Sequence, residues 1–194
     1  MKTNNNSNTG FIPPHGGYKN LISYQKAEIV YDGTVYFTTR FFRKYDRTID
    51  QMVQAARSGK QNIAEASMFS GTSKEVEIKL TNVARASLEE LKIDYQDFLR
   101  TNQLPIWNKE HILVNRLRAL NKTPNANYDT YKKAIENDSP EICANVMIGL
   151  INVVGFLLRK QIEALELAFL QDGGFRERMA KARTAQRRNS PNDK

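Results

Sequence analysis

One stretch decides the fold: residues 139–174 read SPEICANVMIGLINVVGFLLRKQIEALELAFLQDGG. Ser139 followed by Pro140 is typical of a helix start, because the serine hydroxyl caps free N–H groups and proline suits the first turn. Gly173 and Gly174 are typical of a helix end, where glycine adopts backbone angles that other residues avoid. The stretch therefore predicts one long helix.

The centre of this predicted helix is apolar on all sides. Ten of the thirteen residues from 146 to 158 are large and apolar, whereas a helix at the edge of a four-helix bundle needs only one apolar stripe. Either the segment before the helix or another subunit must cover the second face. We favour a subunit interface, at which Asn152 would need a polar partner. We expect the interface to include Met147, Leu150, Val154 and Leu157.

Three more long helices precede this one. Apolar residues recur at spacings of three and four over about 20–44, 48–70 and 72–101. Thr48 with Gln51, and Thr72 with Glu75, fit capping boxes at the starts of the second and third helices. Gly33 interrupts the apolar stripe of the first helix, which indicates a close approach by another helix.

The segment 102–138 is less regular, since prolines and asparagines break its pattern, and it predicts short helices at about 109–120 and 128–135. The fold class that follows is all-α. We expect an antiparallel up-down-up-down four-helix bundle with a short-helix insert before the fourth helix, because short connections make neighbouring helices antiparallel. The expected domain organisation is a flexible arm (1–17), the bundle (18–172, with its insert at about 102–138) and a basic C-terminal extension (173–194).

Composition excludes several classes of protein. One cysteine among 194 residues excludes a disulfide framework and multi-cysteine metal centres, and two histidines leave little for a histidine site. No apolar run approaches the ~20 residues that span a bilayer. The Asn-rich start carries no apolar signal core, so we expect a cytoplasmic protein.

Positive charge is the main functional signal. The chain carries 29 Lys and Arg against 21 Asp and Glu, a net charge of +8, and residues 173–194 hold seven basic and two acidic residues. Such segments are either solvated surface or contacts for a polyanion, and arginine-rich groups favour phosphate. The candidate nucleic-acid-binding residues form two groups: Arg40, Arg43, Lys44, Arg47, Arg57 and Lys60, and then Arg176, Arg178, Lys181, Arg183, Arg187 and Arg188. Three aromatic residues lie beside the first group: Phe41, Phe42 and Tyr45. They either pack in the core or stack on bases.

No catalytic constellation is visible. Bundle metal sites combine inward glutamates with Glu-x-x-His pairs, and the predicted long helices carry no histidine. Glu65 and Arg85 are better explained as pairing with each other or with backbone across helices than as catalytic groups. Cys143 is better explained as a small buried residue than as a nucleophile. The tail has too little apolar surface for a membrane anchor. We expect no enzyme activity, no cofactor, no metal and no membrane partner.

Several motifs resemble one bacterial family. Residues 62–66 (NIAEA) are similar to an N-I-A-E-G motif that closes its second helix, and 73–75 (SKE) with 83–91 (VARASLEEL) are similar to its third helix. Residues 24–27 (YQKA) resemble its W-Q-K-A start. The family is the four-helix-bundle family of the 23S ribosomal RNA intervening-sequence protein, which includes the accessory variability determinant of diversity-generating retroelements. Residues 169–178 (FLQDGGFRER) resemble a C-terminal extension called the four-helix-bundle suffix domain.

The resemblance implies an assembly and a set of partners. Family members look like basic, barrel-shaped homopentamers, and the retroelement member binds nucleic acid and a reverse transcriptase. A pentamer of this chain would carry about +40, a strong field for a polyanion. We therefore expect a non-enzymatic, oligomeric accessory protein that binds nucleic acid, RNA above all, without reading sequence, with a reverse transcriptase as a candidate partner. The alternative is an oligomeric scaffold that binds a protein partner without nucleic acid.

Overall fold

The computed structural model describes Ile12 and residues 15–189. Most of the expected flexible arm, residues 1–11 and 13–14, lies outside the described residues, as do 190–194. The end of that arm is held to the rest of the chain. The Gly16 N–H donates to the Ser67 carbonyl (3.0 Å), and the Ser67 hydroxyl donates back to the Gly16 carbonyl (3.0 Å).

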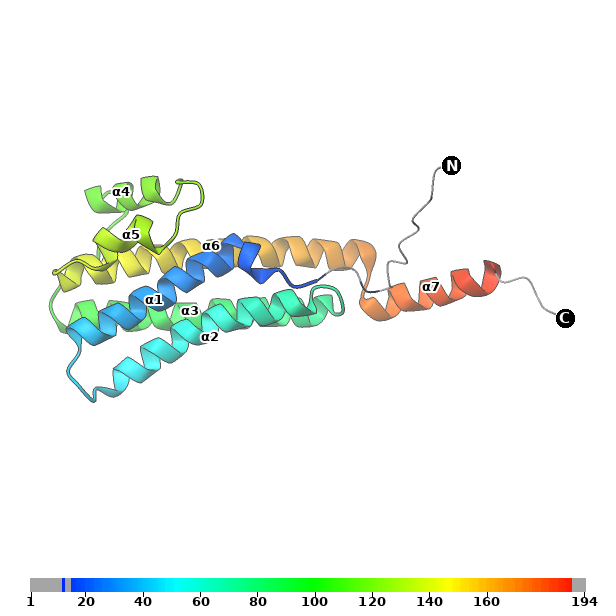
Figure 1. The fold of residues 1–194 in the computed structure, drawn as a ribbon, viewed down its shortest axis with the longest axis horizontal. Coiled ribbons are helices and arrows are strands. Elements are labelled where there is room, and N and C mark those ends of the chain that lie inside the picture. Colours follow the sequence, from blue (N-terminus) through cyan, green and yellow to red (C-terminus); the bar gives the residue numbers. More distant parts are fainter. Residues whose placement is uncertain (1–11, 13–14, 190–194) are drawn as a thin grey trace, which may run out of the picture.

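The described part of the chain is all-α, and no strand occurs in it. After a short 3₁₀ turn (η1, Tyr18–Asn20) come the long helices α1 (Ile22–Phe41), α2 (Arg47–Phe69) and α3 (Lys74–Thr101). Two short helices follow, α4 (Ile112–Leu120) and α5 (Tyr128–Ile135), and then the longest helix, α6 (Pro140–Asp172). A last helix, α7 (Phe175–Asn189), projects from one end of the molecule (Figure 1).

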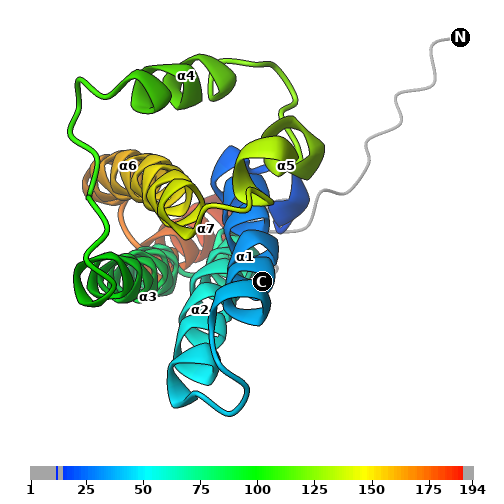
Figure 2. The same ribbon diagram turned by 90° about the vertical axis from the view of Figure 1, so that its left-hand side faces the viewer.

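The four long helices enclose the core. Helix α2 packs against α1 and α3, and α6 packs against the same two helices from the other side (Figure 2). The largest fully buried side chains come from all four, and burying each stabilises the fold by ~1.5–3 kcal/mol. The buried set from these helices includes Phe37, Met52, Ile63, Leu88, Leu91, Tyr95, Leu99, Met147, Leu150 and Ile151. The expected close approach at Gly33 is confirmed, since a Cβ there would lie 2.7 Å from the Met147 sulfur.

Helix starts differ from the sequence prediction by one or two residues. Asp46 rather than Thr48 caps α2: its carboxylate accepts the Thr48 N–H (2.9 Å), which lowers the pKa of Asp46. Ser73 rather than Thr72 caps α3 by accepting the Val76 N–H (3.3 Å). Both capping-box predictions were wrong because neighbouring residues are equally able to cap, and only one has the extended backbone that a cap needs.

The caps of α6 are as predicted. Ser139 accepts the Ile142 N–H (3.4 Å), Pro140 takes the first turn, and Gly173 ends the helix with φ of 72°. Both short helices also form where the sequence places them, with α4 starting three residues later than expected.

The insert covers the second apolar face of α6 over its first half. The backbone N–H of Trp107 donates to the Asn145 side chain (2.8 Å), and its indole N–H donates to Glu141 (2.7 Å). Leu117 of α4 lies against Gly149, where a Cβ would leave it no room. Over this half of the helix, the preceding segment of the same chain therefore covers the apolar centre, and no other subunit is needed.

This packing corrects the choice of interface residues. Met147, Leu150 and Val154 are fully buried within the chain itself, so another subunit cannot reach them without opening the core. Leu157 is half-buried, and Asn152 is exposed rather than buried. The error arose because a helix at the junction of two helices and an insert is apolar on every face without any partner subunit.

Helix α6 also corrects the expectation about apolar runs. It contains an 18-residue window with a mean hydropathy of 2.0, long and apolar enough to cross a membrane by length and composition. Gly149, Asn152 and Gly155 interrupt the apolar residues of this window without lowering its mean hydropathy much. Of that window 56% is buried by the fold, and the core helix of a bundle passes the same test.

Candidate nucleic-acid interface

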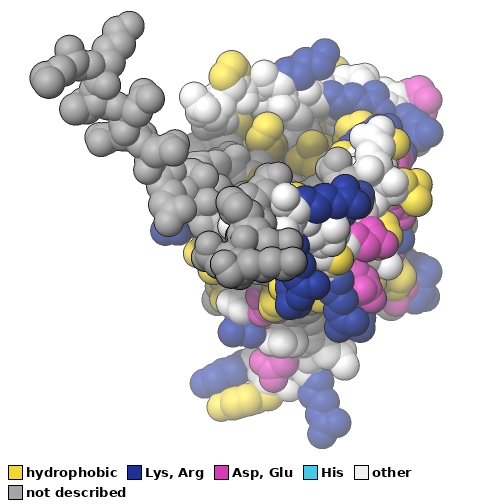
Figure 3. Space-filling model, turned by 90° about the vertical axis from the view of Figure 1, so that its right-hand side faces the viewer, with side chains coloured by type: hydrophobic (Ala, Val, Ile, Leu, Met, Phe, Trp, Pro, Cys, Tyr) yellow, Lys and Arg dark blue, Asp and Glu magenta, His cyan; other side chains and the backbone are white. Residues whose placement is uncertain are grey.

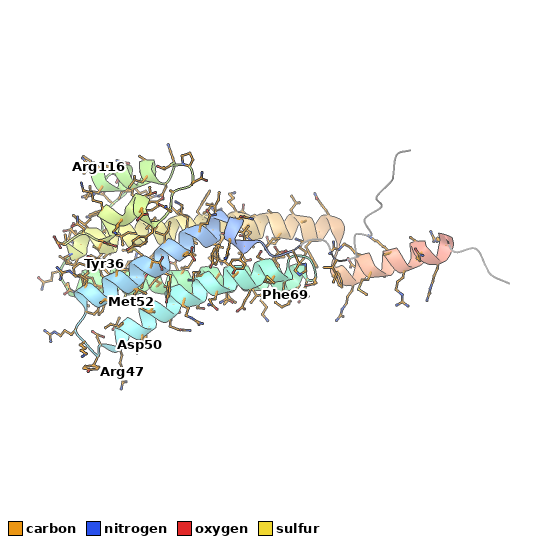
Figure 4. All side chains as sticks on the ribbon, in the orientation of Figure 1. Tyr36, Arg47, Asp50, Met52, Phe69 and Arg116 are labelled. Atoms are coloured by element: carbon orange, nitrogen blue, oxygen red, sulfur yellow. The ribbon has the colours of Figure 1, made fainter. Side chains whose placement is uncertain are left out.

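The first group of predicted cations lies at the turn between α1 and α2. Arg43, Lys44 and Arg47 are exposed, and none of them forms an ion pair among the described residues. Arg40 lies 3.6 Å from Asp138, with both side chains more than half exposed, so this pair is weak. Figure 4 shows Arg47 at the free end of the molecule, with Asp50 one turn further along α2.

The aromatic residues near this turn divide between two roles. Phe41 and Phe42 pack on Phe37, with ring centroids 5.2 and 5.9 Å apart, and so belong to the core. Tyr45 is 87% exposed with φ of 72°, and the Lys44 ammonium lies 5.2 Å from its ring centroid. Only Tyr45 is therefore free to stack on a base.

Arg57 and Lys60 lie further along α2 and face different neighbours. Arg57 is exposed, whereas Lys60 is half-buried with its ammonium 4.3 Å from the Tyr31 ring centroid. The charge of Lys60 also acts on Asp32, whose pKa is nevertheless raised, because burial outweighs the attraction. Lys60 thus interacts with Tyr31 and Asp32 inside the fold, whereas the Arg57 side chain is exposed to solvent.

Acidic residues adjoin the basic turn. A hollow of about 580 Å³ beside Arg43 is lined by Asp46, Asp94 and Asp97, with Phe41, Phe42 and Phe98 among its other walls. The pKa of Asp94 is raised by burial and by the charges of Glu90 and Asp97. A polyanion can therefore approach the turn from its tip but is repelled from the α3 side.

The second group forms most of α7. Six cations and one carboxylate lie on this helix, and its last residues with described side chains are all exposed. The Glu177 carboxylate accepts the Gly174 N–H (3.0 Å) and so caps the helix start. Arg176, Arg183 and Arg187 are spaced by seven and four residues, which places them on one face of the helix.

One side chain at the base of α7 is unusual. Arg178 is half-buried with its guanidinium 5.9 Å from the Phe175 ring centroid, and its Nε is buried without a hydrogen-bond partner among the described residues. Of the six predicted cations of α7, Arg178 is thus the one turned back toward the protein.

The structure does not bring the two groups together. The α1–α2 turn and α7 lie at opposite ends of the long axis (Figure 1). Figure 3, which faces the end from which α7 projects, shows Lys and Arg in several separate patches with Asp and Glu between some of them. A single chain therefore offers two basic ends rather than one continuous basic surface.

The other candidate groups occupy structural positions. Cys143 is buried, and its thiol lies 2.9 Å from the Ile135 carbonyl; burial raises its pKa to about 11. The expected Glu65–Arg85 pair does not form in the described structure, where Arg85 donates to Asn82 (2.9 Å). No cluster of three or more His, Cys, Asp or Glu side chains suited to a metal occurs within the described residues.

Sequence reasoning missed a second surface, on the side of the molecule that α3, α6 and the insert share. Phe156 of α6 is 51% exposed there, with Arg159 against its ring (5.2 Å to the centroid). A hollow of about 520 Å³ lies on one side of Phe156 and another of about 550 Å³ on the other. The only sequence signal was Gly155, a mid-helix glycine that apolar patterning does not explain.

Comparisons with known proteins do not identify a function for this chain. No family model, no curated protein and no solved structure matches it.

Proposed function

We propose that this chain is a non-enzymatic, oligomeric accessory protein that binds nucleic acid, RNA above all, through phosphate contacts and without reading sequence. The observation that carries the proposal is α7, a helix of six cations and one carboxylate that projects from the molecule. No residue of α7 is among the buried residues of the described structure, so packing in the core does not explain its sequence.

The electrostatics favour a polyanion. Arg43, Lys44 and Arg47 add a second exposed basic group without carboxylate partners in the described structure. Lys and Arg that contact phosphates release condensed counterions, which drives binding and makes it depend steeply on salt. Flexible cations on a helix and a turn suit contacts with the phosphate backbone, which carry no sequence information.

The finer architecture belongs to the same proposal. We place the four long helices in an antiparallel up-down-up-down bundle, with the insert before the fourth helix. The resemblance to the intervening-sequence and accessory-variability family supports a homopentamer as the assembly and a reverse transcriptase as a partner. A cytoplasmic location without a membrane partner belongs to the same proposal, because α7 carries too little apolar surface for a membrane anchor.

Two basic ends on one chain gain from such an assembly. In a ring with all chains pointing the same way, each basic end would become a basic rim. The positive charge of each rim would grow with the number of subunits, and its electrostatic field would grow with it. The separation of the two groups within one chain is therefore compatible with polyanion binding by the oligomer.

The alternative is a scaffold that binds a protein partner without nucleic acid. Two observations favour it: the carboxylates of Asp94 and Asp97 beside the basic turn, and the exposed apolar ridge at Phe156.

The deciding experiment measures binding of labelled single-stranded RNA and duplex DNA across a salt series. It compares the full chain with a chain that ends at Asp172 and with a triple charge reversal at Arg43, Lys44 and Arg47. We expect log Kd to change linearly with log salt, by ~0.7 per phosphate contact for single strands and ~0.9 for duplex. Each change should make the slope shallower.

A matched control reverses Lys132 and Lys133, two exposed cations on α5 outside both groups. This control should keep the wild-type slope, apart from a small general effect of net charge. Absence of binding at low salt by the folded oligomer would overturn the proposal and leave the scaffold alternative. An unchanged slope in both test variants would remove the two basic groups from the interface.

A further inference from the structure

The exposed side chain of Phe156 forms an aromatic ridge between two hollows. Phe156 and Asn152 line both of them. The first hollow lies between α6 and α3 and is floored by Ala86, Gly155 and Ile151. The second lies between α6 and the insert and is walled by Trp107, Leu117 and Val153, among others. Figure 2 shows α3, α6 and α4 following one another along this side of the molecule.

Glycine usage within the long helices points to the first hollow. At Gly33, Gly59 and Gly149 a Cβ would come under 3.0 Å from a neighbouring side chain, so packing within the chain requires each of them. At Gly155 a Cβ would meet nothing within 4 Å. A mid-helix glycine costs ~1 kcal/mol relative to alanine, and at this position no close contact with another described residue requires the glycine.

The charges around the ridge are complementary to an acidic partner. The two hollows are lined by Arg85, Lys109, Arg118 and Arg159 against a single carboxylate, Glu89. Glu89 is itself paired with Lys92, while Arg85 and Arg118 bond only to uncharged groups in the described structure. Arg159 already forms an ion pair with Glu163 (2.9 Å). An apolar strip flanked by Arg85 and Arg118, which form no ion pair in the described structure, matches a helix with an apolar face and acidic flanks.

We propose that the Phe156 ridge and its two hollows form a docking site for an acidic amphipathic helix of another protein. The helix lies along α6 over Gly155 and Ala86, where small residues let backbones approach closely. Its apolar side chains fill the hollows beside Phe156, and its carboxylates pair with Arg85 and Arg118. The site is separate from the α1–α2 turn and α7, so it does not depend on nucleic-acid binding.

A helix fits better than an RNA strand. Much of the surface that lines the hollows is apolar, which suits apolar side chains better than a phosphate backbone. Interface hot spots are enriched in aromatic and arginine residues, and Phe156, Trp107, Arg85 and Arg159 provide both kinds here.

The test uses a fluorescein-labelled helical peptide of about 18 residues, about 27 Å long, with leucines on one face and glutamates on both flanks. Anisotropy is measured against the full-length chain, beside a scrambled peptide of the same composition and a version with lysine in place of glutamate. We expect the acidic amphipathic peptide to bind at least about tenfold more tightly than either control peptide.

Three variants locate the site. Gly155→Leu fills the open hollow, Phe156→Ala removes the ridge, and Arg85→Glu reverses one flanking charge; each should weaken peptide binding at least about tenfold. Phe69→Ala, at another exposed phenylalanine, and Arg100→Glu, further along α3, are the matched controls and should leave binding unchanged. Circular dichroism melting of each variant confirms that it is folded.

Several outcomes overturn the proposal. One is no binding of the acidic peptide at ~1 mM, which corresponds to less than ~4 kcal/mol of binding free energy. Another is equal binding by the scrambled peptide or by the Gly155→Leu chain. If Gly155→Leu instead dissociates an oligomer of the chain in sedimentation equilibrium, a second copy occupies the hollow. If it abolishes RNA binding, the surface belongs to the nucleic-acid interface.

Discussion

At the scale of single residues, the least expected feature is a buried lysine that forms no ion pair with a carboxylate among the described residues. Lys26 of α1 is 6% exposed, and its ammonium donates to the Tyr131 hydroxyl and lies 4.5 Å from the centre of that ring. The Tyr131 hydroxyl donates in turn to Asn121 (2.9 Å). This chain of contacts ties α1 to α5 and to the end of α4, and burial lowers the pKa of Lys26.

The lowered pKa of Lys26 predicts a pH dependence of stability. Because the unfolded chain holds the proton more tightly, the cost of burying the ammonium is fully present below the folded-state pKa. That cost fades as the pH rises toward the ordinary lysine value of 10.5. We expect Lys26→Met to raise the free energy of unfolding at pH 7, with an advantage over the wild type that shrinks toward pH 10. Urea unfolding of both chains at several pH values measures this difference.

The comparison must use the difference between the two chains. Burial also raises the pKa of Tyr95 and Tyr128, so the stability of both chains falls as the pH rises through the tyrosine range. This contribution cancels in the difference. An advantage of Lys26→Met that stays constant from pH 7 to 10 would contradict a lowered lysine pKa.

At the scale of helices, two glycines in similar sequence settings have opposite surroundings. At Gly59 of α2 a Cβ would lie 2.7 Å from the Leu88 side chain, and at Gly155 of α6 it would meet open space. We expect Gly59→Ala to destabilise the fold by ~1–3 kcal/mol through overpacking. We expect Gly155→Ala to stabilise it by ~0.5–1 kcal/mol through helix propensity. Chemical denaturation of the two variants beside the wild type measures both changes.

The two substitutions act as controls for each other, since they replace the same residue types in helix interiors. Helix propensity alone would stabilise both, so a stabilising Gly59→Ala would mean that α2 and α3 approach each other less closely than the structure shows. A destabilising Gly155→Ala would mean that another group already packs in the hollow over Gly155. A second copy of the chain would then be the first occupant to test.

The helices could be predicted from the sequence because their signals are local. Ser139, Pro140 and Gly173 fix the ends of α6 without reference to the rest of the chain, and the 3.6-residue period reveals the faces of the others. The caps of α2 and α3 were missed because several adjacent residues can cap, and the path of the loop selects one. The sequence left open whether the insert or another subunit covers α6, and the favoured choice was wrong for its first half. The cover depends on Trp107 and Leu117, which dock on α6 from at least thirty residues earlier in the chain.

The candidate site divides in the same way. Which residues are basic is visible in the sequence, and the structure confirms that most of them are exposed. Their separation into two ends is not visible, because it depends on the length of α6 and on the direction in which α7 leaves it. The Phe156 surface was missed because exposure of one face of an apolar helix is decided by what the insert leaves uncovered.

At the scale of the whole molecule, the core and the basic helix are separable. None of the buried residues among those described lies between 175 and 189, and the last buried apolar side chain is Leu165. A chain that ends at Asp172 should therefore keep the same fold, with a free energy of unfolding within ~0.5 kcal/mol of the full chain. It loses the Gly173 N–H bond to the Phe169 carbonyl, which only caps the end of α6.

Such a truncation separates stability from charge. Thermal melts at low and high salt should coincide for the two chains at high salt, where repulsion among the cations of α7 is screened. At low salt the truncated chain should melt slightly higher, because the full chain carries a net charge of +8 and self-repulsion disfavours a compact state. A melting temperature many degrees lower for the truncated chain at both salt concentrations would mean that α7 packs on the bundle as a structural element. That result would argue against α7 as a free helix whose arginines bind a polyanion.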